Sequence, residues 1–206
     1  MIYDYIIQNF DKDEPIFLAE LPGASRDYVR QEMKKLTDQG KIERLHNGVY
    51  YLAYQTILGT KGKVSIDKYM EKKYLSVNGQ VSGYITGLQL ANNYGLTTQN
   101  PSCYEVCSNE ATTKQRKLEI DGRKIIVYQP VAPITEDNAS ALQFLDLMSN
   151  VDKYAEISGD ELKKKLKLYV NNMSLDFGCV KQYLDLYPDR VYKNIYQGGL
   201  MSELVS

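Results

Sequence analysis

The strongest constraint in this sequence is a helix with a signal at each end, followed directly by a turn signal between two short strands. Ser25 is a suitable N-cap because its hydroxyl can accept a hydrogen bond from a free amide of the first turn, and Gly40 is a suitable C-cap. The apolar positions between them recur at helical spacing and form one stripe: Val29, Met33 and Leu36. We therefore expect an amphipathic helix from about Arg26 to Asp38.

Two strand-like runs follow this helix, at 41–45 and 49–52, on either side of Asn47-Gly48. Asn-Gly is the strongest short signal for a β-hairpin because both residues tolerate a positive φ. Apolar residues before the helix predict a first helix, with Ile2, Ile6 and Phe10, and a short second one, with Phe17, Leu18 and Leu21. This order is the plan of a winged helix-turn-helix, whose recognition helix enters the major groove of DNA while the hairpin touches the backbone.

The polar face of the predicted recognition helix and the hairpin carry side chains that suit DNA. Arg30 and Gln31 can reach base edges, whereas lysine and arginine side chains around them can neutralise phosphates. The predicted DNA-binding set is Arg26, Arg30, Gln31, Lys34, Lys35, Lys41, Arg44 and Asn47. Since the chain has a net charge of −1, any affinity for DNA must come from this local patch. Its basic excess is slight, so a purely structural role for the exposed face is left open.

A loop-like stretch, Gly59-Thr60-Lys61-Gly62-Lys63, divides the expected domains into 1–60 and 61–206. The second domain begins with a predicted short helix from Ser65 to Tyr74 and a longer helical pattern over 83–94. Strands are predicted at 102–106 and 124–128, with a polar loop between them, and helices from Asn138 onward. The expected fold class is α+β: a winged head followed by a mixed, mostly helical domain with a few strands.

The sequence offers no catalytic constellation, so we expect a protein that is not an enzyme and that needs no cofactor or metal. The single histidine, His46, falls at the predicted hairpin tip, and the glycines at 79–83 lack the lysine of a phosphate-binding loop. Cys103 and Cys107 are too far apart along one strand to share a metal. A site made of acidic residues alone is left open. Three cysteines without a paired motif, no signal peptide and no long apolar run together predict a cytoplasmic protein without a membrane partner.

The stretch from Ser82-Gly83-Tyr84 to Tyr94-Gly95-Leu96-Thr97-Thr98-Gln99-Asn100-Pro101 resembles a signature of the AbiEi-type antitoxins. In that family a helix precedes Gly-Leu-Thr-Thr-Gln and a strand follows it. Three later segments are also similar, at 125–128, 134–138 and 187–191, and the winged head fits the same arrangement. The resemblance covers nearly the whole chain, although only the segment from Gly95 to Pro101 is fairly specific.

The resemblance implies an antitoxin of a type IV toxin–antitoxin system, associated with abortive infection and phage defence. In such proteins the winged head binds operator DNA and represses its own operon, while the second domain counters a nucleotidyltransferase toxin without forming a stable complex with it. Two other interpretations stay open. One is a stand-alone winged-helix transcriptional regulator whose second domain senses a ligand or dimerises, and the other is an interaction module that contacts protein instead of DNA.

Overall fold

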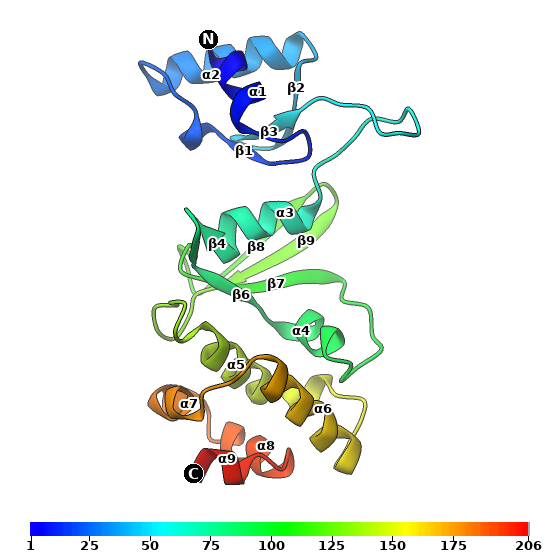
Figure 1. Cartoon of the computed structure of the whole chain (residues 1–206), viewed down its shortest axis with the longest axis vertical. Coiled ribbons are helices and arrows are strands. Elements are labelled where there is room, and N and C mark those ends of the chain that lie inside the picture. Colours follow the sequence, from blue (N-terminus) through cyan, green and yellow to red (C-terminus); the bar gives the residue numbers. More distant parts are fainter. Residues whose placement is uncertain (206) are drawn as a thin grey trace. The chain divides into compact units, whose positions relative to one another are not determined.

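The helix marked by Ser25 and Gly40 runs from Arg26 to Asp38 (α2) in the computed structural model, which describes residues 1–205 (Figure 1). The Ser25 hydroxyl accepts a hydrogen bond from the Tyr28 amide at 3.2 Å, and Gly40 takes a φ of 68° just beyond the helix end. The three residues of the predicted apolar stripe are buried: Val29, Met33 and Leu36. The prediction for this helix is confirmed at both ends.

The elements around α2 surround a small core of their own. They are helix α1 (Ile2–Asn9), strand β1 (Ile16–Phe17), a 3₁₀ turn (Leu18–Glu20), strand β2 (Ile42–His46) and strand β3 (Val49–Leu52). The strands form an antiparallel sheet in the order β1-β3-β2. The short second helix that the sequence predicts is only the 3₁₀ turn, because Ile16 and Phe17 pair with β3 directly before it.

The first compact unit of the chain comprises Met1–Lys72 with Ile120–Gly122, and we call it the head. It therefore extends past residue 60 and includes helix α3 (Ile66–Met70), which is capped by the Ser65 hydroxyl. A π turn over Glu71–Leu75 follows α3. The stretch 53–65 before α3 is irregular, as the sequence predicts for residues 59–63 within it, apart from one isolated bridge between Gln55 and Lys61.

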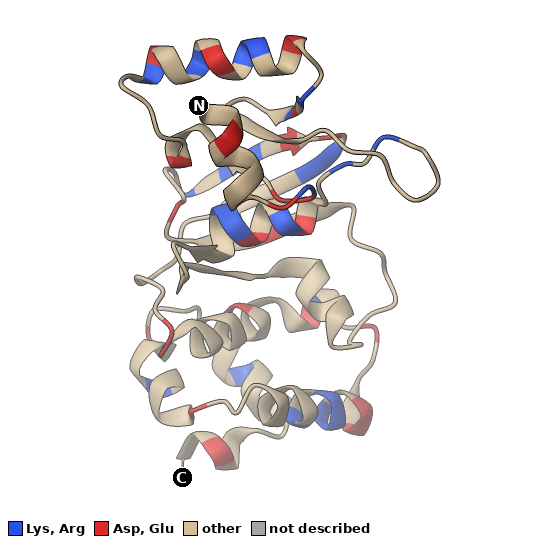
Figure 2. Cartoon of the chain, turned by 45° about the horizontal axis from the view of Figure 1, so that its top comes forward, with Lys and Arg blue, Asp and Glu red and all other residues tan. Residues whose placement is uncertain are grey.

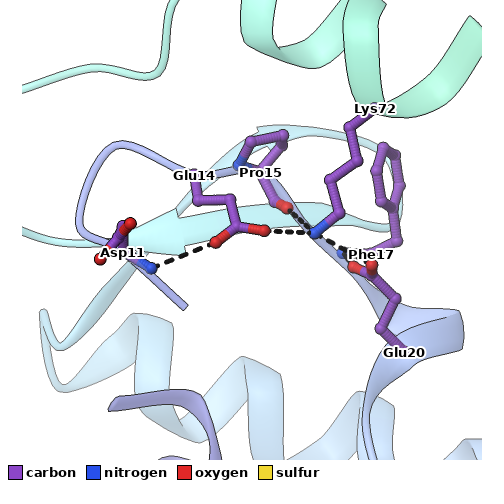
Figure 3. Close-up of polar contacts among 6 residues, drawn as sticks. All are labelled: Asp11, Glu14, Pro15, Phe17, Glu20 and Lys72. Carbon is purple, nitrogen blue, oxygen red and sulfur yellow. Dashed lines mark hydrogen bonds and ion pairs between the residues drawn. The ribbon is translucent and has the colours of Figure 1, made fainter. Parts of the chain in front are cut away.

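Lys72, in this π turn, joins several parts of the head (Figure 3). Its ammonium lies 2.8 Å from the Glu14 carboxylate, 2.9 Å from the Glu20 carboxylate and 2.9 Å from the carbonyl of Pro15. Glu20 also accepts a hydrogen bond from the Phe17 amide at 2.8 Å. A partly buried ion pair with several partners holds its geometry better than an isolated surface pair. The residues around β1 are thus fixed by a lysine outside the predicted 1–60 domain.

The second unit, which we call the body, spans Lys73–Glu119 and the described residues from Arg123 onward. Its strands are β4 (Ser76–Val77), β5 (Gln80–Val81), β6 (Gly83–Ile85), β7 (Cys103–Ser108), β8 (Gln115–Ile120) and β9 (Arg123–Tyr128). Strands β4 and β5 form a small hairpin, and the other four form a sheet in the order β6-β7-β9-β8. The central strands β7 and β9 are parallel, whereas β6 runs antiparallel to β7.

Two sequence predictions for the body are wrong. The helical pattern over 83–94 begins as strand β6, and only Gly87–Asn93 forms a helix, α4. The polar loop expected between β7 and β9 contains the whole of β8, which turns into β9 through Asp121 and Gly122, both with positive φ. Strand β8 is an edge strand with mostly exposed polar side chains, so it has no apolar alternation to reveal it.

Helices make up the rest of the body, as the sequence predicts from Asn138 onward, and lie to one side of the four-stranded sheet (Figure 1). They are α5 (Ala139–Tyr154), α6 (Gly159–Asn172), α7 (Phe177–Leu184), α8 (Arg190–Gln197) and α9 (Met201–Val205). The core of the body is centred on α5, whose buried residues pack against those of α6, α7 and α8. No helix among residues 1–205 has both the length and the apolar character needed to cross a membrane.

Candidate functional site

Helix α2 buries one stripe and leaves its other side in solvent. On the exposed side lie five of the predicted DNA-binding residues: Arg26, Arg30, Gln31, Lys34 and Lys35. Figure 2 shows that basic and acidic residues alternate along this helix. The structure therefore brings this part of the predicted set onto one solvent-facing helix surface, with acidic side chains between its members.

The exposed cations of α2 differ in their surroundings. Arg30 pairs with Asp27 at 3.1 Å and Lys35 with Glu32 at 2.7 Å, and the Arg26 guanidinium donates to the carbonyl of Leu18 at 2.9 Å. The hydrogen bond to Glu32 raises the pKa of Lys35. Among the described residues, Lys34 has no ion pair. Exposed pairs of this kind contribute about 0–1 kcal/mol, so a phosphate can replace the carboxylate at little cost.

The β2–β3 hairpin brings two more predicted residues together. The Arg44 guanidinium donates to the Asn47 side-chain oxygen at 2.7 Å and to the His46 carbonyl at 3.3 Å. A register shift lies between Arg44 and His46, and only Gly48 of the Asn-Gly pair takes a positive φ, 75°. The eighth predicted residue, Lys41, lies before β2, with its ammonium 4.8 Å from the centre of the Tyr3 ring.

A second exposed basic surface lies on the β8–β9 hairpin of the body, which the sequence analysis treated as a loop. Its basic side chains are all exposed: Lys114, Arg116, Lys117, Arg123 and Lys124. None of them takes part in an ion pair within residues 1–205. The positive charge of this hairpin is thus less neutralised by acidic side chains than that of α2, where two of the four cations are paired with carboxylates.

The body also contains a cavity of about 370 Å³ between its sheet and helix α5. Polar and aromatic side chains from both sides line it, among them Thr86, Glu105, Tyr128, Asp146, Asn150 and Tyr154. None of these residues belongs to the functional set that the sequence predicts. One signal was present, since Asp146 interrupts an apolar run between Leu145 and Leu147, both of which are buried.

Asp146 is held at the cavity by hydroxyl groups. Its Oδ2 atom accepts hydrogen bonds from the Tyr84 hydroxyl at 3.0 Å and from the Thr86 hydroxyl at 3.4 Å. Burial raises the pKa of Asp146 to about 6, although these hydrogen bonds act in the opposite direction. Burial, together with the nearby charge of Asp146, raises the pKa of Cys107 to about 12. The thiol is therefore neutral at physiological pH and unsuited to act as a nucleophile.

The segment 95–101, which carries the most specific part of the family resemblance, is fixed by Glu156, two residues past the end of α5. The Glu156 carboxylate accepts hydrogen bonds from the Thr98 amide and hydroxyl at 2.6 and 2.9 Å and from the Gln99 side chain at 3.0 Å. The Thr98 amide, and next the Gln99 side chain, lower the pKa of Glu156 to about 2. Leu96 anchors the segment in the core. Packing and hydrogen bonding thus account for these residue types without any ligand.

Within residues 1–205, no three side chains of His, Cys, Asp or Glu come together as metal ligands would. No model of a known protein family matches the sequence, and no curated protein matches it significantly. The basic surfaces and the cavity described above are therefore the features from which a function can be inferred.

Proposed function

We propose that the head is a winged helix-turn-helix that binds double-stranded DNA through α2 and the β2–β3 hairpin, and that the chain is a cytosolic transcriptional regulator. The observation that carries this proposal is the division of α2 into a buried stripe and a polar, solvent-facing side. Arg30, Gln31 and Lys34 project from that side. In this motif the exposed side of the recognition helix enters the major groove.

The hairpin supports the same interpretation. Arg44 and Asn47 are joined by a hydrogen bond at its tip, where a winged-helix protein contacts the DNA backbone. The acidic side chains of α2 offset part of its charge, so we expect the affinity to depend on a few phosphate contacts and to fall steeply with salt. The exposed cations of the β8–β9 hairpin offer further phosphate contacts within the same chain.

On the resemblance to AbiEi-type antitoxins, we further propose that the regulated gene cluster is the chain's own operon and that the chain is its type IV antitoxin. The body then counters a nucleotidyltransferase toxin, with no stable complex between the two proteins. The region upstream of the gene is the natural DNA probe, because autorepression requires an operator there.

The salt dependence of binding is measured as the slope of log K against log salt concentration. We expect Lys34→Ala and Arg44→Ala each to reduce the magnitude of this slope by about 1, because each removes one phosphate contact. Gln31→Ala should instead cost about 1–3 kcal/mol at a single base pair and relax specificity there. Fluorescence anisotropy with the upstream region, at several salt concentrations, measures both effects. Lys167→Ala, an exposed change on α6 of the body, is the control. Unchanged binding in all three head variants would refute DNA docking through α2.

The antitoxin assignment is tested by survival. We expect full-length protein, co-expressed with a nucleotidyltransferase toxin of the kind that the proposal places in its operon, to restore growth, and a fragment from residue 73 onward to do so without the head. The body has its own core of buried residues, which gives it the means to fold alone. Rescue by the head alone would contradict the division of labour. Failure of the full-length protein, with DNA binding intact, would favour a stand-alone regulator.

A further inference from the structure

The cavity of the body is built from two separate parts of the chain. Glu105 and Tyr128 line it from strands β7 and β9, and Asp146, Asn150 and Tyr154 line it from helix α5. Its volume of about 370 Å³ is at the lower end of the range for small-molecule sites, about 300–1,000 Å³. A cavity of this size, with polar groups on facing walls, suits a small organic molecule.

The two carboxylates at the cavity are positioned by neutral donors. Tyr84 and Thr86 hold Asp146, and the Tyr128 hydroxyl donates to Glu105 at 2.8 Å. Neither carboxylate takes part in an ion pair within residues 1–205. Acidic groups that are partly or fully shielded from water usually have a cation beside them, because an isolated buried charge is costly.

Lys153 also lines the cavity, and it is the cation that the chain itself provides there. Its ammonium lies 5.3 Å from the centre of the Tyr154 ring, and its side chain is exposed. Lys153 forms no ion pair with Asp146 or Glu105. Neither Asp146 nor Glu105 is therefore neutralised by a direct ion pair, and a cationic guest can form one with them.

Gly87 leaves space for the Glu105 carboxylate. A methyl group at this position would lie 2.4 Å from the Glu105 Oε1 atom, and Gly87 has a φ of 68°. The tyrosine rings at 128 and 154 add aromatic surface, which attracts organic cations through the negative face of the ring. This aromatic surface, beside the two carboxylates, favours a positively charged guest with an apolar part.

We propose that this cavity binds a small organic cation, with an ammonium or guanidinium group placed between Asp146 and Glu105 and its carbon chain against the tyrosines. The site lies within the body and does not depend on DNA binding by the head. It gives the regulator a means of responding to an amine-bearing metabolite.

The test uses the full-length protein without DNA and a matched set of probes: n-butylammonium, n-butylguanidinium, n-butanol and butyrate. We expect the two cations to shift the amide resonances of Thr86, Gly87 and Asn150 in a saturable way, with a Kd below about 1 mM. The neutral and anionic probes should bind at least about tenfold more weakly, because one charged contact of about 1.4 kcal/mol or more separates them. Equal binding of n-butanol, or preferential binding of butyrate, would overturn the proposal.

Variants locate the binding. Asp146→Asn and Glu105→Gln should each weaken the binding of n-butylammonium at least about tenfold, while the amide spectrum of the protein stays well dispersed. Asp152→Asn changes an exposed acid on the same helix outside the cavity and should leave the affinity unchanged. Lys153→Met should leave binding as it is or strengthen it, since it removes a like charge. Unaltered affinity in both cavity variants, or loss of binding in Lys153→Met, would contradict the site. Should the head fail to bind DNA, saturable binding of the cations by the body would still support the proposed site.

Discussion

Gly83→Ala is expected to destabilise the body by about 3 kcal/mol or more, because there is no room for a methyl group at this position. An added Cβ would lie 2.3 Å from the Tyr74 carbonyl oxygen and 2.6 Å from the Cys107 carbonyl oxygen. Both are backbone atoms, so neither can move away as a flexible side chain would. The variant must separate β6 from its neighbours or shift the π turn, and urea unfolding of the full-length protein measures the cost.

Gly79→Ala is the control for this experiment. Gly79 lies in the β4–β5 turn with a φ of 77°, and an added methyl would meet no atom within 4 Å. We expect a loss of about 1 kcal/mol from backbone strain alone. If the two variants were equally stable, the close approach of backbone atoms around Gly83 would not be the controlling factor.

Asp146→Asn is expected to stabilise the protein at neutral pH and to have little effect near pH 4. Burial raises the pKa of Asp146 from 3.8 to about 6, so the folded state holds this proton more tightly than the unfolded state does. The group therefore contributes stability below about pH 4, and this contribution is lost as the pH rises to about 6. The rise in pKa from 3.8 to about 6 corresponds to a difference in stability of about 3 kcal/mol as an upper value.

Urea unfolding of the wild type and the variant at pH 4, 5, 6 and 7.5 measures this difference. Because the two proteins are compared at the same pH, the effects of other titrating groups on stability cancel. One such group is Glu156, whose lowered pKa changes stability with pH in the opposite direction. The amide oxygen of Asn can still accept from Tyr84 and Thr86. Asp152→Asn, exposed on the same helix, should show no such trend. A gap between Asp146→Asn and wild type that did not change with pH would show that Asp146 titrates normally.

The sequence predicted best those elements whose signals are local. The ends of α2 follow from Ser25 and Gly40, because each acts on backbone groups within one turn of itself. The helices of the body were predicted because their buried stripes recur at helical spacing, as in Leu142, Leu145 and Met148 on α5. In these cases the deciding interactions lie within a few residues of one another.

Elements decided by distant partners were missed. Residues 83–85 continue a helical pattern, but pairing of Gly83 with Ser108 and of Tyr84 with Cys107 makes them a strand. The parallel pairing of β7 with β9 is equally nonlocal. The cavity was missed for the same reason, since Glu105 and Asp146 belong to no short motif and line one cavity only because α5 packs on the sheet. Asp146 within an apolar stretch was the one local indication.

Lys72 has a consequence for how the head forms during synthesis. The chain leaves the ribosome from its N-terminus at about 5–20 residues per second. Glu14 is made 58 residues before the lysine that pairs with it, so α1, α2 and the β2–β3 hairpin are complete while the two glutamates still lack their counter-ion. The contact that fixes the region before α2 can therefore form only after the π turn has emerged, and the Lys63–Asp121 pair of the head forms later still.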